Sequence, residues 1–313
     1  MSERFQNIAV VGLGLIGGSM CKTIKNRTDC KVYAHNRTQA VSEKAKEEGA
    51  VTGILGEDAG LSEMDLIILG LYPDACIEYV KNNLSEFKKD AVIVDCCGTK
   101  QKICSALYEL CKRNGLFFIG GHPMAGIEKS GFDASFDGLF NNASMILCKL
   151  NKNITDEELC KPDEREYNSE YDSAYMALKG FFLSVGFGYV KESTPEEHDR
   201  VIAYTSQMAH VVSSAYIKSE ACKTRYGFSA GSFKDMTRVA FLNETMWTEL
   251  FLENRECLLR EMDEFMQHMR QYHDALEHYD EEELCKLLKE GRLCKTADIQ
   301  GEEEQQKRQQ SEQ

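Results

Sequence analysis

Short apolar runs alternate with helical patterns through the first half of the chain. The apolar runs have the length of strands and lie at residues 7–11, 31–35, 65–70, 91–95 and 116–119. Helical patterns lie between them, one ending near residue 27 and others covering 39–49 and 100–114. This alternation is typical of a parallel, doubly wound sheet, in which ligands bind at the carboxyl ends of the strands. The first half is therefore predicted to be an α/β domain.

A highly charged segment without an apolar period, residues 151–171, is predicted to be a surface excursion. It lies among further predicted elements, which are strands at 144–150 and 187–191 and a helix over 173–183. A new helix is predicted to start at Pro195, because acidic residues follow this proline in the first turn. The predicted domains are a sheet domain over residues 1–194 and a second domain over 195–297.

From residue 196 onward the pattern is helical and contains no convincing strand. Within 196–219 one face is apolar and predicted to be buried, whereas another is small and polar. The apolar face comprises Val201, Met208, Val212 and Ala215, and the polar face Ala203, Ser206, Gln207, His210 and Ser213. His210 on this polar face indicates either a ligand-facing surface or a hydrogen bond between helices.

A long apolar stripe follows, from Trp247 to Leu276, with spacings of three and four residues over about eight turns. Such a helix has more apolar surface than a small domain can cover, so a dimer interface is predicted, with a long core helix as the alternative. The final segment, 298–313, is rich in Gln and Glu and is predicted to be disordered.

A glycine-rich motif lies between the first strand and the first helix. Gly12 allows a tight turn, Gly14 lets a pyrophosphate approach the backbone, and Gly17 lets the helix pack on the strand. The amino end of the helix would then offer free N–H groups to the phosphates. The motif predicts a Rossmann-type dinucleotide site with contacts from Gly12, Gly14, Leu15, Ile16, Gly17 and Leu71.

The end of the second strand distinguishes between the two nicotinamide dinucleotides. A carboxylate there would bind the ribose 2′-hydroxyl of NAD, but the chain has Asn36, Arg37 and Thr38. Arg37 is able to pair with a 2′-phosphate, and its neighbours to share hydrogen bonds with it. We therefore predict NADP, with NAD as the alternative; an ordinary surface role for Arg37 is the competing interpretation.

The composition of the 313 residues excludes several classes of partner. The net charge of −14 argues against nucleic acids and anionic membranes, and no apolar run has the length of a membrane span. The thirteen cysteines are odd in number and include no C-x-x-C spacing, which favours reduced thiols in the cytoplasm over disulfides or a metal site.

Two loops and one helix carry the candidate chemistry. His122 lies in the glycine-rich loop 120–126, which predicts an unusual backbone path and a residue that can move a proton near neutral pH. The loop 95–100, with Gly98 and Thr99, is expected to face the nicotinamide, although Thr99 is also able to cap a helix. Further along, Arg238 is expected to bind a carboxylate, oriented by Asp235, unless the two form only a surface ion pair.

Together these motifs make the sequence resemble the prephenate/arogenate dehydrogenase family of tyrosine biosynthesis, up to about residue 290. The resemblance rests on V-G-L-G-L-I-G-G-S at 11–19, G-H-P-M-A-G at 121–126, and F-K-D-M-T-R at 233–238 with Trp247 downstream. It implies a Rossmann domain, an all-helical dimerisation domain, and a cleft between them that binds a small substrate. It also implies oxidative decarboxylation, with His122 taking the proton of the ring hydroxyl.

The resemblance further implies that Arg238 holds a substrate carboxylate and that His210 lines the pocket, with Gly98, Thr99, Gln207, Asp235 and Trp247 as further substrate-side residues. Two positions depart from the family. Gly98 stands where many relatives carry a serine, and Gln207 where some carry a second histidine. Neither a chorismate mutase domain nor a regulatory domain of the ACT type is present in the sequence.

The leading prediction is a monofunctional, homodimeric prephenate dehydrogenase, and arogenate dehydrogenase is the nearest alternative. An ammonium group distinguishes arogenate from prephenate, so a carboxylate near the substrate side chain would favour arogenate. The same fold would also suit a reductase, such as an imine reductase, or a nucleotide sensor that has lost its chemistry.

Overall fold

The computed structural model describes residues 4–149 and 162–311. By its internal contacts the chain forms two compact units, Met1–Arg255 and Glu256–Gln313, and each is described by itself.

One eight-stranded sheet organises the first unit, in the order β3-β2-β1-β4-β5-β6-β7-β8. The strands are β1 (Asn7–Val11), β2 (Lys31–His35), β3 (Gly53–Ile54), β4 (Leu66–Leu69), β5 (Val92–Asp95), β6 (Phe117–Pro123), β7 (Ser144–Cys148) and β8 (Tyr189–Ser193). Neighbours from β3 to β6 are parallel, which confirms the predicted doubly wound sheet. Strand β7 runs antiparallel to β6, and β8 runs parallel to β7.

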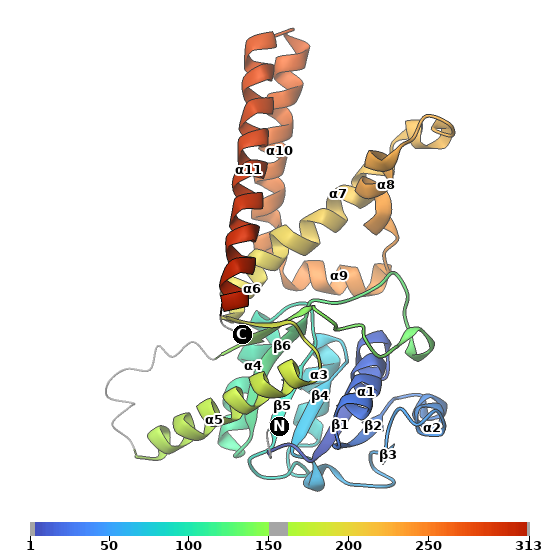
Figure 1. Cartoon of the computed structure of the whole chain (residues 1–313), viewed down its shortest axis with the longest axis vertical. Coiled ribbons are helices and arrows are strands. Elements are labelled where there is room, and N and C mark those ends of the chain that lie inside the picture. Colours follow the sequence, from blue (N-terminus) through green and yellow to red (C-terminus); the bar gives the residue numbers. More distant parts are fainter. Residues whose placement is uncertain (1–3, 150–161, 312–313) are drawn as a thin grey trace. The chain divides into compact units, whose positions relative to one another are not determined.

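Helices cover both faces of this sheet (Figure 1). Successive strand residues point to opposite faces, so Val10 and Ile68 lie in one apolar cluster and Ala9 and Ile67 in the other. The first cluster includes residues of α1 (Leu15–Arg27), α2 (Gln39–Glu47) and α5 (Pro162–Ser184), and the second residues of α3 (Pro73–Asn82) and α4 (Gln101–Arg113). Strands buried on both faces explain the continuous apolar runs in the sequence. Short 3₁₀ turns lie at Leu61–Glu63 and Phe132–Ala134.

The structure corrects two predictions about this unit. Strand β6 continues through His122, which pairs with Ile146 of β7, so the histidine is not in a loop. The surface excursion predicted for 151–171 is wrong from residue 162 onward, because α5 begins there; the preceding part lies outside the described residues. Tyr171 and Tyr175 are buried one helical turn apart, a stripe that the surrounding charged residues hide in the sequence.

The helical part of the first unit begins at Thr194, whose side chain accepts a hydrogen bond from the backbone N–H of Glu197. It contains α6 (Pro195–Ile202), a π-helical segment η3 (Ala203–Met208), α7 (Ala209–Tyr216), α8 (Gly231–Thr237), α9 (Glu244–Glu253) and 3₁₀ turns at Glu220–Thr224 and Arg238–Ala240. The single helix predicted over 196–219 is therefore interrupted. The wider π turn also changes which face is buried: Met208 is buried as predicted, whereas Val201 and Ala215 are exposed.

The second unit consists of α11 (Glu281–Ser311) and nearly all of α10 (Arg255–Glu277). The helix predicted to run from Trp247 to Leu276 is broken at Asn254, whose side chain binds Asp199 and Gln207. The prediction of disorder from residue 298 is wrong for the described part of the tail, because α11 extends to Ser311. Glu, Gln, Lys and Arg favour a helix intrinsically even where little apolar surface is buried.

Membrane spans and disulfides, the two features addressed from composition, can be compared with the described residues. No helix among them is long and apolar enough to cross a membrane. Within 4–149 and 162–311, the twelve cysteines are free thiols.

Candidate active site

The glycine-rich turn after β1 has the shape of a phosphate cradle. Gly12 has a φ of +95°, and a Cβ there would lie 2.6 Å from the carbonyl oxygen of Gly70. A Cβ at Gly17 would overlap the carbonyl oxygen of Gly12, so helix and strand pack as predicted. At Gly14 the space is open to 4 Å. With the free N–H groups of the first turn of α1 beside it, this space fits the pyrophosphate of a dinucleotide.

The end of β2 lies beside this cradle. The Asn36 side chain accepts a hydrogen bond from the backbone N–H of Leu13 (3.0 Å) and donates one to the carbonyl of Thr38 (3.2 Å). Its amide therefore fixes the glycine-rich turn. Arg37 and Thr38 are exposed, and Arg37 forms no ion pair with any residue of the described ranges. Leu71 is partly buried against Gly12.

A buried carboxylate at the end of β5 connects the next two loops. Asp95 accepts hydrogen bonds from the backbone N–H groups of Gly121 (3.0 Å) and Cys97 (2.9 Å). It also forms an ion pair with Lys100, and both side chains are fully buried. Burial alone would lower the pKa of Lys100, but the nearby Asp95 carboxylate raises it above its ordinary value. Asp95 thus joins the residue before His122 to the loop that was expected to face the nicotinamide.

The two loop residues predicted to face the substrate have different neighbours. The Thr99 hydroxyl donates a hydrogen bond of 2.6 Å to Glu253 at the end of α9. A Cβ at Gly98 would lie 3.3 Å from the side chain of Leu250. The Thr99 hydroxyl is thus directed to a carboxylate of α9, and Leu250 lies beside the position of the missing serine side chain.

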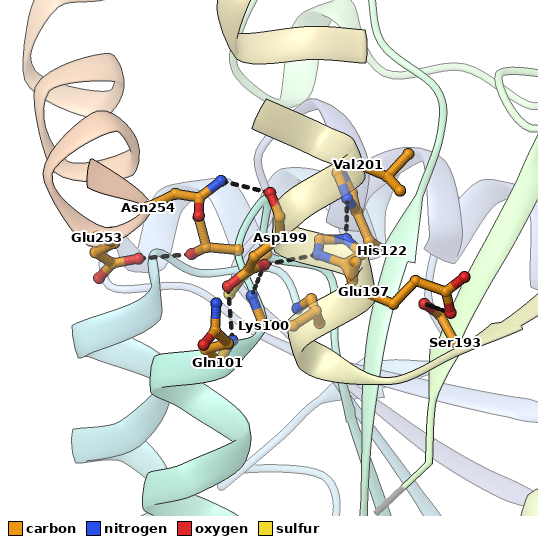
Figure 2. A network of polar contacts seen from close by, with 12 residues as sticks. Lys100, Gln101, His122, Ser193, Glu197, Asp199, Val201, Glu253 and Asn254 are labelled. Atoms are coloured by element: carbon orange, nitrogen blue, oxygen red, sulfur yellow. Dashed lines mark hydrogen bonds and ion pairs between the residues drawn. The ribbon is translucent and has the colours of Figure 1, made fainter. Parts of the chain in front are cut away.

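His122 is linked to two residues that the sequence did not single out. Its Nδ1 lies 2.9 Å from Nε2 of His198, and Nδ1 of His198 lies 2.7 Å from Asp199. Asp199 also accepts hydrogen bonds from the backbone N–H groups of Lys100 (2.7 Å) and Gln101 (2.9 Å) at the start of α4. Figure 2 shows Asp199 at the centre of this network.

Burial sets the protonation of the three linked groups. It lowers the pKa of His122 well below the ordinary 6.5, and the Lys100 ammonium, as well as His198 whenever it is protonated, lowers it further. Burial also lowers the pKa of His198, although the Asp199 carboxylate opposes this. Burial would raise the pKa of Asp199, but the hydrogen bond from His198 and the two backbone N–H groups keep it below its ordinary value. Near neutral pH both imidazoles are therefore neutral and the carboxylate is ionised.

Three of the predicted substrate-side residues gather around α7. The ring of His210 lies 3.9 Å from that of Trp247 between centroids, and its Nδ1 lies 3.1 Å from the carbonyl oxygen of Val239. Arg238, the next predicted residue, is exposed and forms an ion pair of 2.5 Å with Glu128, not with Asp235 as predicted. Glu128 follows His122 by six residues. Burial lowers the pKa of His210, and the negative charge of Glu128 opposes this.

Gln207 is almost fully buried and binds residues within the fold. Its amide donates to the carbonyl of Leu250 (3.1 Å) and accepts from Asn254 (2.8 Å), which also donates to the carbonyl of Asp199 (2.7 Å). The side chain thus fastens the end of α9 to η3. A direct contact between Gln207 and a substrate is not supported by this arrangement.

The arrangement matches known proteins over most of the chain. Sequence profiles of the prephenate dehydrogenase nucleotide-binding domain and dimerisation domain match residues 20–161 and 194–290. The chain belongs to the prephenate dehydrogenase family. It is thus an NAD(P)-dependent oxidoreductase.

Among relatives in the prephenate dehydrogenase family is a cyclohexadienyl dehydrogenase of Zymomonas mobilis, 28% identical, with 94% of this chain and 96% of the relative covered. A prephenate dehydrogenase of Bacillus subtilis is 28% identical, with 92% and 75% covered. The solved prephenate dehydrogenase of Aquifex aeolicus, in complex with hydroxyphenyl propionate and NAD+, has a TM-score of 0.75 and is 26% identical, covering 95% of this chain and 99% of that one.

His198, Asp199, Lys100 and Asp95 form the buried polar network beside His122, and the sequence did not single them out. The start of α6 at Pro195 was recognised, and a His–Asp pair in the following turn was the available signal. Its meaning depends on the neighbouring strand and helix, which local patterns do not show.

Proposed function

We propose that this enzyme converts prephenate to 4-hydroxyphenylpyruvate and carbon dioxide, with NADP as hydride acceptor. The observation that carries the proposal is the placement of His122 near the carboxyl end of β6, with its Nδ1 2.9 Å from Nε2 of His198. The pKa of His122 is held well below 6.5, so near neutral pH the imidazole can accept a proton. The strand ends at this edge of the sheet also carry the dinucleotide cradle.

In the proposed reaction, His122 accepts the proton of the ring hydroxyl as the C–H bond on the same carbon breaks. The nicotinamide, when bound, accepts the hydride. The carboxylate on the opposite ring carbon leaves as carbon dioxide, and its bonding electrons complete the aromatic ring. His122 then returns its proton to the phenolic oxygen, so the enzyme ends in its starting state. Arg238 would hold a substrate carboxylate and so orient the ring against His122.

NADP is proposed over NAD on the basis of the end of β2. Asn36 is committed to the glycine-rich turn, so Arg37 and Thr38 are the residues available to a 2′-phosphate. An exposed guanidinium there favours a phosphate, and no carboxylate follows the strand to bind a ribose hydroxyl.

Arogenate is the second candidate substrate, and one observation favours it. Glu128 lies against Arg238, so a carboxylate is present beside the predicted carboxylate clamp. An ammonium group on the substrate side chain would be attracted to it, whereas the keto group of prephenate would not.

We also propose that the enzyme is a homodimer in the cytoplasm. The matched dimerisation profile supports the dimer, as do exposed apolar side chains on the two long helices. Among them are Met266, Met269, Leu276, Leu288 and Leu293. Sedimentation of the full chain would test the dimer, and a monomer at micromolar concentration would contradict it.

The function is tested by following reduced cofactor with prephenate or arogenate, each with NADP and with NAD. Turnover with prephenate and NADP is expected, and His122→Asn should reduce kcat by about 10²–10⁴-fold. The matched control is His268→Asn, which changes an exposed histidine of α10. If none of the four mixtures is turned over while NADP still binds, the proposal fails. Arg37→Gln should raise the KM for NADP and leave that for NAD unchanged.

A further inference from the structure

The chain of contacts from His122 to Asp199 has one consistent assignment of protons near neutral pH. The ionised Asp199 carboxylate can only accept, so Nδ1 of His198 carries a proton and donates it. Nε2 of the neutral His198 then has no proton and must accept from Nδ1 of His122. The remaining nitrogen of His122, Nε2, is left unprotonated.

We propose that His198 and Asp199 are positioning residues, which hold His122 in the tautomer whose Nε2 accepts the substrate proton. This inference rests on the proposed function for its catalytic consequence. His198 and Asp199 are 2% and 1% exposed, so they act through His122 and not by touching substrate. The opposite tautomer would place a proton on Nε2, where it would block the reaction.

The same pair also stabilises the state that follows proton transfer. When His122 gains the substrate proton on Nε2, its Nδ1–H still points to Nε2 of His198. The positive charge is then shared along the two rings toward the Asp199 carboxylate. Two other charged groups act on the pair, Lys100 just before α4 and Asp95 of β5, which form a buried ion pair and offset one another.

Asp199 is itself held in place by the fold. Its two carboxylate oxygens accept the backbone N–H groups of Lys100 and Gln101, which lie at the positive end of the α4 dipole. These hydrogen bonds keep the carboxylate ionised and prevent its rotation away from His198. The start of α4 therefore orients Asp199, Asp199 orients His198, and His198 orients His122.

The decisive variant is Asp199→Asn. The amide nitrogen is able to donate to Nδ1 of His198, which moves the His198 proton to Nε2 and the His122 proton from Nδ1 to Nε2. We expect kcat to fall by about 10²-fold or more, with KM within about threefold of the wild type. Nitrogen-15 NMR of histidine-labelled enzyme should show the His122 proton on Nδ1 in the wild type and on Nε2 in the variant.

A second pair of variants keeps the test valid if Asp199→Asn does not fold. His198→Gln retains an oxygen that can accept from Nδ1 of His122, whereas His198→Leu does not. The glutamine variant is expected to keep kcat within about tenfold of wild type, and the leucine variant to lose about 10²-fold or more.

Several results would overturn the inference. These are an unchanged kcat in Asp199→Asn, a His122 proton on Nε2 in the wild type, or equal activity of the two His198 variants. If the wild type turns over neither substrate, the proposed function fails instead, and the NMR measurement still decides the tautomer without substrate.

Discussion

The buried pair of Lys100 and Asp95 allows a quantitative prediction about stability. Replacing Lys100 with methionine retains the length of the side chain but removes its charge. Both side chains are 0% exposed, so Asp95 would be left as a buried carboxylate with only the N–H groups of Cys97 and Gly121 as partners. Breaking a buried pair by removing one partner costs about 3–5 kcal/mol. This is a large fraction of the total stability of about 5–15 kcal/mol that proteins have.

Urea unfolding followed by circular dichroism measures the effect. A loss of this size lowers the midpoint by about 1 M or more. The control is Lys44→Met, which removes a lysine whose ion pair with Asp133 is exposed, and it should leave the midpoint unchanged. The double variant Asp95→Asn/Lys100→Met should lose about 1–3 kcal/mol less free energy of unfolding than the two single variants lose together.

The reasoning would be refuted if Lys100→Met unfolded at the same urea concentration as the wild type and Lys44→Met. It would also be refuted if the two single losses at Asp95 and Lys100 were simply additive. Either result would mean that the loop before α4 is held by different contacts.

Three further predictions concern the site. Because the folded state lowers the pKa of His122, the unfolded state binds more protons near and below pH 6.5. The free energy of unfolding should therefore fall as the pH drops below about 6.5, and it should fall less in His122→Asn. Melting temperatures of both proteins between pH 7 and 5 measure this difference. Gly98→Ser should raise the KM for substrate, because its Cβ would press on Leu250, and Leu250→Ala should relieve the effect; an unchanged KM would contradict this packing. Glu128→Gln should lower the KM for prephenate about two- to fivefold, because it releases Arg238 from its ion pair, and it should raise the KM for arogenate. An equal change in KM for both substrates would exclude Glu128 as the partner of the arogenate ammonium group.

Much of the sheet could be predicted from the sequence, because its strands are buried on both faces and read as unbroken apolar runs. The turn at Gly12 and Gly17 was recognisable because close packing there permits no side chain. Strand β3 has only two residues and gave no comparable signal. The continuation of β6 through His122 was missed because glycines and proline locally favour a turn, whereas pairing with β7 extends the strand.

The sequence singles out a candidate residue where chemistry and local motif coincide, as at His122 and Arg238, whose roles stay predictions. It was not predictable where a side chain takes its role from a distant segment. Gln207 was predicted to contact a ligand because it lies on a polar helix face, but its amide hydrogen-bonds the carbonyl of Leu250 in α9 and the side chain of Asn254. Arg238 was assigned a partner one helical turn away, whereas the structure pairs it with Glu128, 110 residues earlier.

The contacts of α9 bear on how the first unit folds. Glu253 is bound by Thr99 and Lys102, and Asn254 by Asp199 and Gln207. The end of this short helix is therefore fastened to the start of α4 with the loop before it, and also to α6 and η3. Three of these four partners, Thr99, Lys102 and Asp199, are absent from an excised fragment that begins after residue 200. In native-state hydrogen exchange, the amides of α9 should therefore open together with the central strands and not as a separate subglobal event. The helical segment after β8, up to the end of α9, and the sheet would then be one cooperative unit.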